Sequence, residues 1–326
     1  MRSLSAQAER WPIAGAFVIA RGSKTEAHVV TVEIAEDGKV GRGEATPYPR
    51  YGETVESVLA EIEEARPFIE GGRGRGKLQG RMKPGAARNA IDCALWDLEA
   101  KRANRRAYVL AGSPRLEPVQ TAFTISLGPP QTMAEHAAAN AARPLLKLKI
   151  GGPGDLDRVE AVRRAAPGAR LIVDANEGLS FEDFRLLAPE LAKLGVVLIE
   201  QPLRAGEDEA LQGFESPVLL CADESLHTRA ELAACVGRYG CVNIKLDKAG
   251  GLTEALALAT EARTIGLQIM VGCMVSTSLA MAPALILAQG AEFVDLDGPL
   301  LLAQDRKPGL TYLGSMVEPS TPELWG

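Results

Sequence analysis

The sequence is poor in cysteine and histidine, and this scarcity excludes several kinds of site. Its 326 residues include five cysteines, with no CxxC spacing, and three histidines, none of them placed as a metal pair. An odd number of cysteines without a pattern favours reduced thiols and a cytoplasmic protein. The lack of histidine disfavours histidine-based metal sites and Ser-His-Asp catalysis. The catalytic side chains are therefore expected among Lys, Asp and Glu.

Long apolar runs and an excess of positive charge are also absent. No apolar stretch approaches the roughly 20 residues that a membrane-spanning helix needs. The 42 acidic residues outnumber the 36 Lys and Arg, which gives a net charge of −6. The one basic cluster, at 73–77, is too short and glycine-rich to form a nucleic-acid surface. We therefore expect neither a nucleic-acid nor a membrane partner.

The first 115 residues have the pattern of an α+β domain. Alternating apolar residues over 29–34, followed by an Asp-Gly turn at 37–38, predict a β-hairpin. Thr54 is a candidate N-cap for a helix that ends near residue 70. Apolar residues at helical spacing over 87–98 predict a second helix. We expect residues 1–115 to form a capping domain.

Residues 116–304 repeat one unit, a short β-rich run followed by a helical stretch. The eight predicted runs are 121–126, 145–149, 171–174, 196–200, 218–223, 242–245, 268–272 and 293–297. Repeated strand–helix units of this length are typical of a parallel barrel. Because no full helix follows the eighth run, the pattern predicts a TIM-type (β/α)7β barrel. The remaining tail, 305–326, is expected to return to the N-terminal domain.

Charged residues end most of these predicted strands, where the active site of a barrel lies. Lys147 and Lys149 end the second run on one face of the strand, and two crowded ammonium groups are expected to lower each other's pKa. Asp174, Glu200 and Asp223 end the third, fourth and fifth runs. Three converging carboxylates repel one another unless a hard divalent cation lies among them, and Mg²⁺ is the natural choice.

The sixth and eighth runs complete the ring of charges. Lys245 ends the sixth run, across the barrel from the first two lysines, and Asp295 and Asp297 end the eighth. Taken singly, each residue has an ordinary explanation: a strand-end Asp is commonly a cap, and Lys245 is explained by an ion pair. Together they are not explained in this way, because burying so many charges costs too much for a fold that needs only stability.

The combination resembles the enolase superfamily, in the branch related to muconate lactonizing enzymes, over nearly the whole chain. The motifs that carry the resemblance are Lys147-Leu148-Lys149, Asp174-Ala175-Asn176, Ile199-Glu200-Gln201-Pro202, Ala222-Asp223-Glu224-Ser225 and the stretch 243–251. The resemblance implies one Mg²⁺ per subunit, held by Asp174, Glu200 and Asp223, which binds a substrate carboxylate and stabilises an enediolate. Lys149 and Lys245 would exchange protons on opposite faces of the α-carbon, with Lys147 assisting electrostatically.

Other residues resemble one subfamily, the dipeptide epimerases. Asp295 and Asp297 resemble its Asp-x-Asp pair, which binds the free α-ammonium of a dipeptide, and Thr124 matches a substrate-contacting position. Arg21 resembles the arginine that grips a glutamyl γ-carboxylate, and its alternative explanation is an exposed loop arginine. Lys24 is a weaker alternative for the same role.

The expected activity is therefore Mg²⁺-dependent epimerisation of a dipeptide, L-Ala-D/L-Glu from peptidoglycan turnover, in a protein that is compatible with a homo-oligomer. Ser276 and Leu179 depart from residues that are frequent in relatives and bear on side-chain preference. One alternative is an o-succinylbenzoate synthase, N-acylamino acid racemase or cycloisomerase of the same superfamily. Others are a Schiff-base lyase with Lys245 as nucleophile and a non-catalytic dipeptide-binding relative.

Overall fold

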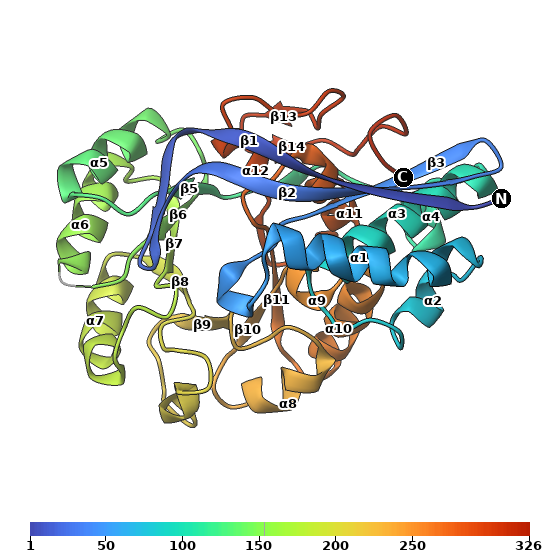
Figure 1. The fold of residues 1–326 in the computed structure, drawn as a ribbon. Helices are drawn as coiled ribbons and strands as arrows, with labels where there is room; N and C mark the ends of the chain where they lie inside the picture. The colour runs from blue at the N-terminus through green and yellow to red at the C-terminus, as the bar shows by residue number, and fades with distance from the viewer. Residues whose placement is uncertain (153) are drawn as a thin grey trace.

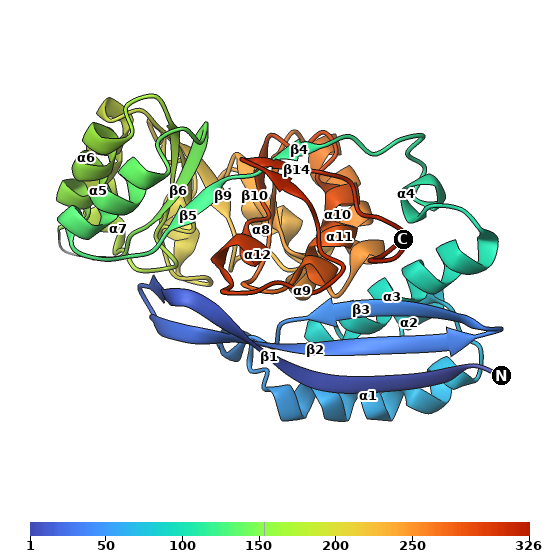
Figure 2. The ribbon, with the colours of Figure 1, turned by 90° about the horizontal axis from the view of Figure 1, so that it is seen from above.

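The computed structural model describes residues 1–152 and 154–326. A three-stranded antiparallel sheet forms the N-terminal part, and an eight-stranded parallel sheet in sequential strand order forms the larger part. Figure 2 shows the N-terminal sheet along one side of the barrel, with its hairpin extending past the barrel strands. The predicted barrel with an N-terminal α+β region is confirmed.

The N-terminal sheet consists of β1 (Ser3–Ile19), β2 (Gly22–Glu36) and β3 (Lys39–Ala45), with helices α1 (Val55–Glu70) and α3 (Ala86–Ala103) packed on it. The predicted Thr54 cap is present, since its side chain accepts a hydrogen bond from the Ser57 amide. Helix α3 lies so close to β3 that a Cβ at Gly43 would be 2.1 Å from the Ala90 carbonyl oxygen. Only glycine permits this approach.

The eight barrel strands match the predicted runs to within a few residues. They are β5 (Phe123–Ile125), β6 (Leu145–Lys149), β7 (Arg170–Asp174), β8 (Val196–Glu200), β9 (Leu219–Ala222), β10 (Cys241–Ile244), β11 (Gln268–Gly272) and β12 (Phe293–Asp295). The chain closes the barrel through a 2.8 Å hydrogen bond from the Ala122 amide to the Val294 carbonyl. Closure brings the ends of all eight strands to one rim.

The connections around the barrel are less regular than the sequence predicts. Full helices occur at α5 (Pro130–Ala139), α6 (Asp155–Ala165), α7 (Phe181–Lys193), α10 (Leu252–Thr264) and α11 (Ser278–Leu287). After β8 and β9 there are only short turns, η2 (Asp208–Leu211), η3 (Arg229–Glu231) and α8 (Leu232–Cys235). Gly206 and Gly213 flank η2 with φ of 82° and 72°, which interrupts a helix there. After β12 there is one turn, α12 (Gly298–Leu301).

Alternation along β6 separates the barrel into layers. Leu145 belongs to an apolar cluster with residues of the other barrel strands, whereas Leu146 and Leu148 pack in the large core that includes the helices. Lys147 and Lys149 share the strand face of Leu145, toward the carboxyl end. The apolar cluster therefore fills the base of the barrel and leaves the charged residues at its rim.

The C-terminal tail contacts the N-terminal region. Its short strands β13 (Tyr312–Leu313) and β14 (Met316–Val317) form a hairpin, and β14 pairs with β4 (Val119–Gln120). The Gly326 amide donates to Asp97, and the Trp325 indole N–H donates to the Cys93 carbonyl. These contacts fit a returning tail, while the domain limits 1–115 and 116–304 stay a prediction. Among the described residues, no helix is long and apolar enough to cross a membrane.

Asp247 joins the two parts of the molecule at a buried position. It lies in the short helix α9 (Leu246–Ala249) and accepts hydrogen bonds from the Thr46 amide at 2.9 Å and the Asn89 side chain at 3.0 Å. Burial, only partly offset by these hydrogen bonds, raises the pKa of Asp247 to about 7. The folded protein therefore binds this proton more tightly than the unfolded chain does.

This raised pKa predicts that stability falls as pH rises from about 4 to about 7, because over that range the folded state holds a proton that the unfolded chain has released. Asp247→Asn keeps an acceptor oxygen without the charge, so we expect it to flatten this slope and to stabilise the protein at pH 8. Urea denaturation at several pH values measures the effect. Asp157→Asn, at an exposed position, is the matched control and should keep the wild-type slope. An Asp247→Asn slope equal to wild type would contradict the assignment.

Candidate active site

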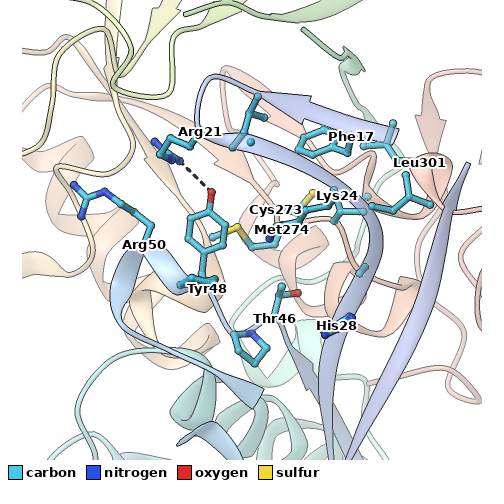
Figure 3. A pocket seen from close by; sticks show the side chains of 18 of the residues that line it. Phe17, Arg21, Lys24, His28, Thr46, Tyr48, Arg50, Cys273, Met274 and Leu301 are labelled. Atoms are coloured by element: carbon cyan, nitrogen blue, oxygen red, sulfur yellow. Dashed lines mark hydrogen bonds between the residues drawn. The ribbon is translucent and has the colours of Figure 1, made fainter. Parts of the chain in front are cut away.

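A cavity of about 910 Å³ lies between the N-terminal sheet and the carboxyl ends of the barrel strands. Most of the predicted site residues line it, namely Arg21, Lys24, Thr124, Lys147, Lys149, Asp223, Lys245, Asp295 and Asp297. Asp174 and Glu200 are fully buried beneath them. Figure 3 shows that Phe17, Arg21, Tyr48 and Arg50 of the N-terminal region surround the opening. The structure therefore brings all the predicted site residues to one place.

Each of the three predicted metal ligands faces a lysine through one carboxylate oxygen. The Lys149 ammonium lies 2.5 Å from Asp174 Oδ2, and that of Lys245 lies 2.7 Å from Asp223 Oδ2. The Lys147 ammonium is 2.7 Å from Glu200 Oε2. Lysines on β6 and after β10 thus balance the negative charge of the carboxylates at the ends of three neighbouring strands.

The other oxygen of each carboxylate is fixed by the protein. Asp174 Oδ1 accepts from the Asn176 amide at 2.9 Å, and Glu200 Oε1 accepts from the Asn243 side chain at 2.7 Å. Asp223 Oδ1 accepts from Lys248 at 2.6 Å. Each carboxylate is therefore held on its outer side, as metal ligands are when outer partners orient them. The three oxygens that face the lysines are the inner oxygens of the site. At each of them, another cation could replace the lysine.

This donor set fits a hard divalent cation. Carboxylate oxygens are the ligands that Mg²⁺ prefers, and the buried Glu200 Oε2 has the Lys147 ammonium at 2.7 Å but no hydrogen bond among the described residues. In the described ranges 1–152 and 154–326, no three acidic, histidine or cysteine side chains stand together at metal-binding distances. The lysines lie between the carboxylates, so binding a metal requires the ammonium groups to move away.

The expectation that the crowded lysines lower each other's pKa is wrong for Lys147. Its burial lowers the pKa, but Asp295, Glu200 and Asp174 outweigh burial and raise the pKa well above its usual value. The pKa of Lys245 is likewise raised, because Asp223 and Glu200 outweigh burial. Lys147, Lys149 and Lys245 each have a carboxylate oxygen within 2.7 Å. Basicity suited to proton removal therefore depends on another cation neutralising those carboxylates.

An acidic pair, Asp295 and Asp297, lies beside the three carboxylates, since the Lys147 ammonium contacts both Glu200 and Asp295. Asp297 Oδ2 accepts from the Thr124 amide at 2.7 Å, and Asp295 Oδ2 accepts from Lys147 at 2.7 Å. Asp295 Oδ1 is buried with no hydrogen-bond partner among the described residues. Burial and the neighbouring Asp295 raise the pKa of Asp297 to about 7. A cationic group on a ligand would relieve this concentration of negative charge.

Arg21 and Lys24 differ in how much of their bonding capacity is free. Arg21 donates to the Asn176 carbonyl, Glu177, Tyr48 and Glu224. Lys24 lies over the Tyr48 ring, with its ammonium 5.0 Å from the ring centre, and no ion pair or hydrogen bond is found for it within the described part of the chain. The Lys24 ammonium therefore has its donors free for a ligand anion in the cavity that it lines (Figure 3).

Several residues around the cavity had no role assigned from the sequence. Tyr48, Arg50, Glu177 and Lys248 fall in this group, and Glu224 was recognised only as part of a motif. The Lys-x-x-Lys spacing of 245 and 248 was a usable signal for Lys248, since it places both ammonium groups near one strand end. Ser276 and Leu179 do not line the cavity, whereas Cys273, Met274 and Val275 do.

Comparison with known families and curated proteins gives matches over nearly the whole chain. Residues 1–112 match the mandelate racemase / muconate lactonizing enzyme N-terminal domain, and residues 132–304 match the enolase C-terminal domain-like family. The chain is 50% identical to an L-Ala-D/L-Glu epimerase of Escherichia coli, covering 96% of this chain and 98% of the relative. It is 44% identical to an N-acetyl-D-glutamate racemase of a Pseudoalteromonas species, covering 91% and 95%.

Solved structures agree with these relatives. An enolase family member of Agrobacterium tumefaciens with homology to dipeptide epimerases, holding sodium and L-Ala-L-Glu, is 55% identical with a TM-score of 0.98, and the match covers 100% of both chains. A dipeptide epimerase of Enterococcus faecalis in complex with Mg and L-Leu-L-Tyr is 28% identical with a TM-score of 0.91, covering 98% of this chain and 96% of that one.

Proposed function

The chain belongs to the mandelate racemase / muconate lactonizing enzyme family of the enolase superfamily, and from this premise we propose that it is a Mg²⁺-dependent isomerase that epimerises dipeptides. The proposed substrate is L-Ala-D/L-Glu, inverted at the α-carbon of the C-terminal residue. The observation that carries the proposal is the placement of Lys149 and Lys245 on strands across the barrel, above three carboxylates anchored from outside.

In this proposal Asp174, Glu200 and Asp223 hold the metal. When bound, Mg²⁺ supplies the positive charge that stabilises a substrate carboxylate as its α-carbon loses a proton. Lys149 and Lys245 exchange roles as base and acid: one removes the α-proton, and the other, protonated, delivers a proton to the opposite face. Two bases on opposite faces suit inversion, whereas a one-base elimination needs only one of them. Lys147, paired with Glu200 and Asp295, adds fixed positive charge.

The rest of the cavity suits the two ends of a dipeptide. Asp295 and Asp297 would bind the free α-ammonium, with the backbone of Thr124 holding Asp297 in place. For the glutamyl γ-carboxylate we propose Lys24 as the direct partner, because Arg21 already donates to four protein acceptors. The five cysteines are free thiols, which supports a cytoplasmic location, where dipeptides from peptidoglycan turnover would be its substrates.

Racemisation of N-acetylglutamate is the second candidate, favoured by the 44% identical relative of that name. N-acetylglutamate shares the two carboxylates of the glutamyl residue but has no ammonium group for Asp295 and Asp297. A Schiff-base lyase is less well supported, since the similar curated proteins are named an epimerase and a racemase.

Asp297→Asn separates the two candidates. We expect kcat/KM for L-Ala-L-Glu to fall about 10- to 100-fold, the effect of losing a charge-assisted hydrogen bond to the substrate ammonium. Any activity on N-acetyl-L-glutamate should change little, because that substrate has no cation at this end. Both rates are followed by chiral chromatography or polarimetry. Equal losses on both substrates would contradict a role in binding the ammonium, and a wild-type preference for N-acetylglutamate would favour the second candidate.

Lys24→Met tests the γ-carboxylate assignment. We expect the KM for L-Ala-L-Glu to rise about tenfold or more, while the kinetics with L-Ala-L-Leu should stay the same or improve, because only glutamate offers an anion to this lysine. Steady-state kinetics with both dipeptides measure the change. Lys39→Met, in an exposed position on β3, controls for loss of one positive charge. If Lys24→Met affects both dipeptides equally, Lys24 does not read the side chain.

A further inference from the structure

Glu177 has an unusual backbone conformation for its residue type. It follows β7 in the loop after Asp174, and its φ is 68°, in the left-handed region that favours glycine. A glutamate in this region is strained, and such strain persists where the surrounding structure needs the side chain. The glutamate side chain is only 5% exposed. Its contacts should therefore explain why a glutamate occupies this position.

The Glu177 carboxylate accepts four hydrogen bonds from three separate loops. Arg50 binds both oxygens, through Nε and Nη2, each at 2.7 Å. Arg21 Nη1 donates to Oε2 at 3.0 Å, and the Ala205 amide, in the loop after β8, donates to Oε1 at 2.9 Å. The two-point Arg50 contact is the strong, directional form of an arginine–carboxylate pair.

The two arginines come from the two N-terminal segments that cover the cavity. Arg21 stands at the turn between β1 and β2, and Arg50 lies in the short helix η1 (Pro49–Tyr51). Both segments line the cavity (Figure 3), and the β1–β2 turn reaches the barrel near β7 and β8 (Figure 1). Tyr48 joins the two segments directly, since its hydroxyl accepts from Arg21 at 3.0 Å.

Glu177 connects both of these N-terminal segments to the barrel. Glu224, at the end of β9, binds Arg21 alone, at 2.7 Å. Among the described residues, Glu177 is the barrel carboxylate with ion pairs to both arginines. Its partners Arg21 and Arg50 line the cavity, and in the described part of the chain Glu177 contacts neither the lysines nor the acidic pair assigned to the reaction.

We propose that Glu177 is a positioning residue that holds the β1–β2 turn and the 48–51 segment closed over the cavity through Arg21 and Arg50. The closing of the two segments by Glu177 is independent of the reaction. The effect of closing on substrate binding rests on the proposed epimerase function. If closure is required for binding, a larger open population weakens apparent substrate affinity in proportion, and the proton transfers in the closed complex are unchanged.

Glu177→Gln tests this proposal, because it keeps the size of the side chain but removes the charge and one acceptor oxygen. We expect amide hydrogen exchange in the 17–24 and 46–53 segments to accelerate about tenfold, and KM for L-Ala-L-Glu to rise by a similar factor with kcat within about twofold. Glu182→Gln is the matched control, since Glu182 pairs with Arg185 on the exposed surface of α7. Arg50→Met, which removes the same contact from the other side, should reproduce the effect.

Hydrogen exchange tests the closing of the segments, and the kinetics test its effect on substrate binding, so the two results are independent. Unchanged exchange in both segments of a folded Glu177→Gln protein, with the same thermal midpoint as Glu182→Gln, would overturn the proposal. Faster exchange with KM unchanged, or with a lowered kcat in place of a raised KM, would overturn the positioning role. Faster exchange in a protein whose wild type does not epimerise dipeptides would support the closing of the segments by Glu177 and contradict the proposed function instead. Additive effects of Glu177→Gln and Arg50→Met in the double variant would contradict a shared contact.

Discussion

The arrangement of the cavity depends on pairing buried lysines with buried carboxylates at the rim of the barrel. Lys147, Lys149 and Lys245 are each at most 6% exposed, and the three carboxylates they face are at most 1% exposed. Unpaired charges at such depth cost several kcal/mol each, roughly, so every group must have a partner of opposite sign. A fold selected for stability alone would place apolar side chains there, as it does at the base of the same barrel.

This pairing also explains how the site can change state. The outer oxygens of Asp174, Glu200 and Asp223 are held by the protein, and the inner oxygens face lysines. A divalent cation would bind the inner oxygens in place of the lysines, and a substrate carboxylate would bind that cation. Lys149 and Lys245 would then be available for proton transfer. Asp295 and Asp297 likewise concentrate negative charge and can bind a further cation.

Much of this arrangement follows from the sequence because barrel strands obey a simple rule. Strand ends meet at one rim and side chains alternate, so a lysine or carboxylate at the end of each run can be placed without coordinates. The rule placed Lys147, Asp174 and Asp223 correctly. The rule does not give the pKa of Lys147, because that pKa depends on carboxylates of three other strands and not on the neighbouring lysine alone.

Contacts between distant loops were beyond the sequence pattern. The role of Glu177 depends on a left-handed backbone and on arginines more than a hundred positions away in the chain, and neither has a local signature. The short turns after β8 and β9 were missed because glycines interrupt segments that otherwise read as helical. The choice between Arg21 and Lys24 required knowing which cation already had partners.

In the proposed mechanism, Lys149 and Lys245 act on opposite faces of one α-carbon. The most direct measurement is ¹H NMR in D₂O with Mg²⁺, following the glutamyl α-proton of L-Ala-L-Glu and of L-Ala-D-Glu with the wild type, Lys149→Ala and Lys245→Ala. We expect the wild type to exchange the α-proton of both epimers and to interconvert them, and EDTA to stop both reactions. Each single variant should lose epimerisation, by about 10²-fold or more, and exchange the proton of only one epimer, a different one for each variant. Exchange of the same epimer by both variants, or epimerisation that survives loss of either lysine, would contradict the two-lysine mechanism.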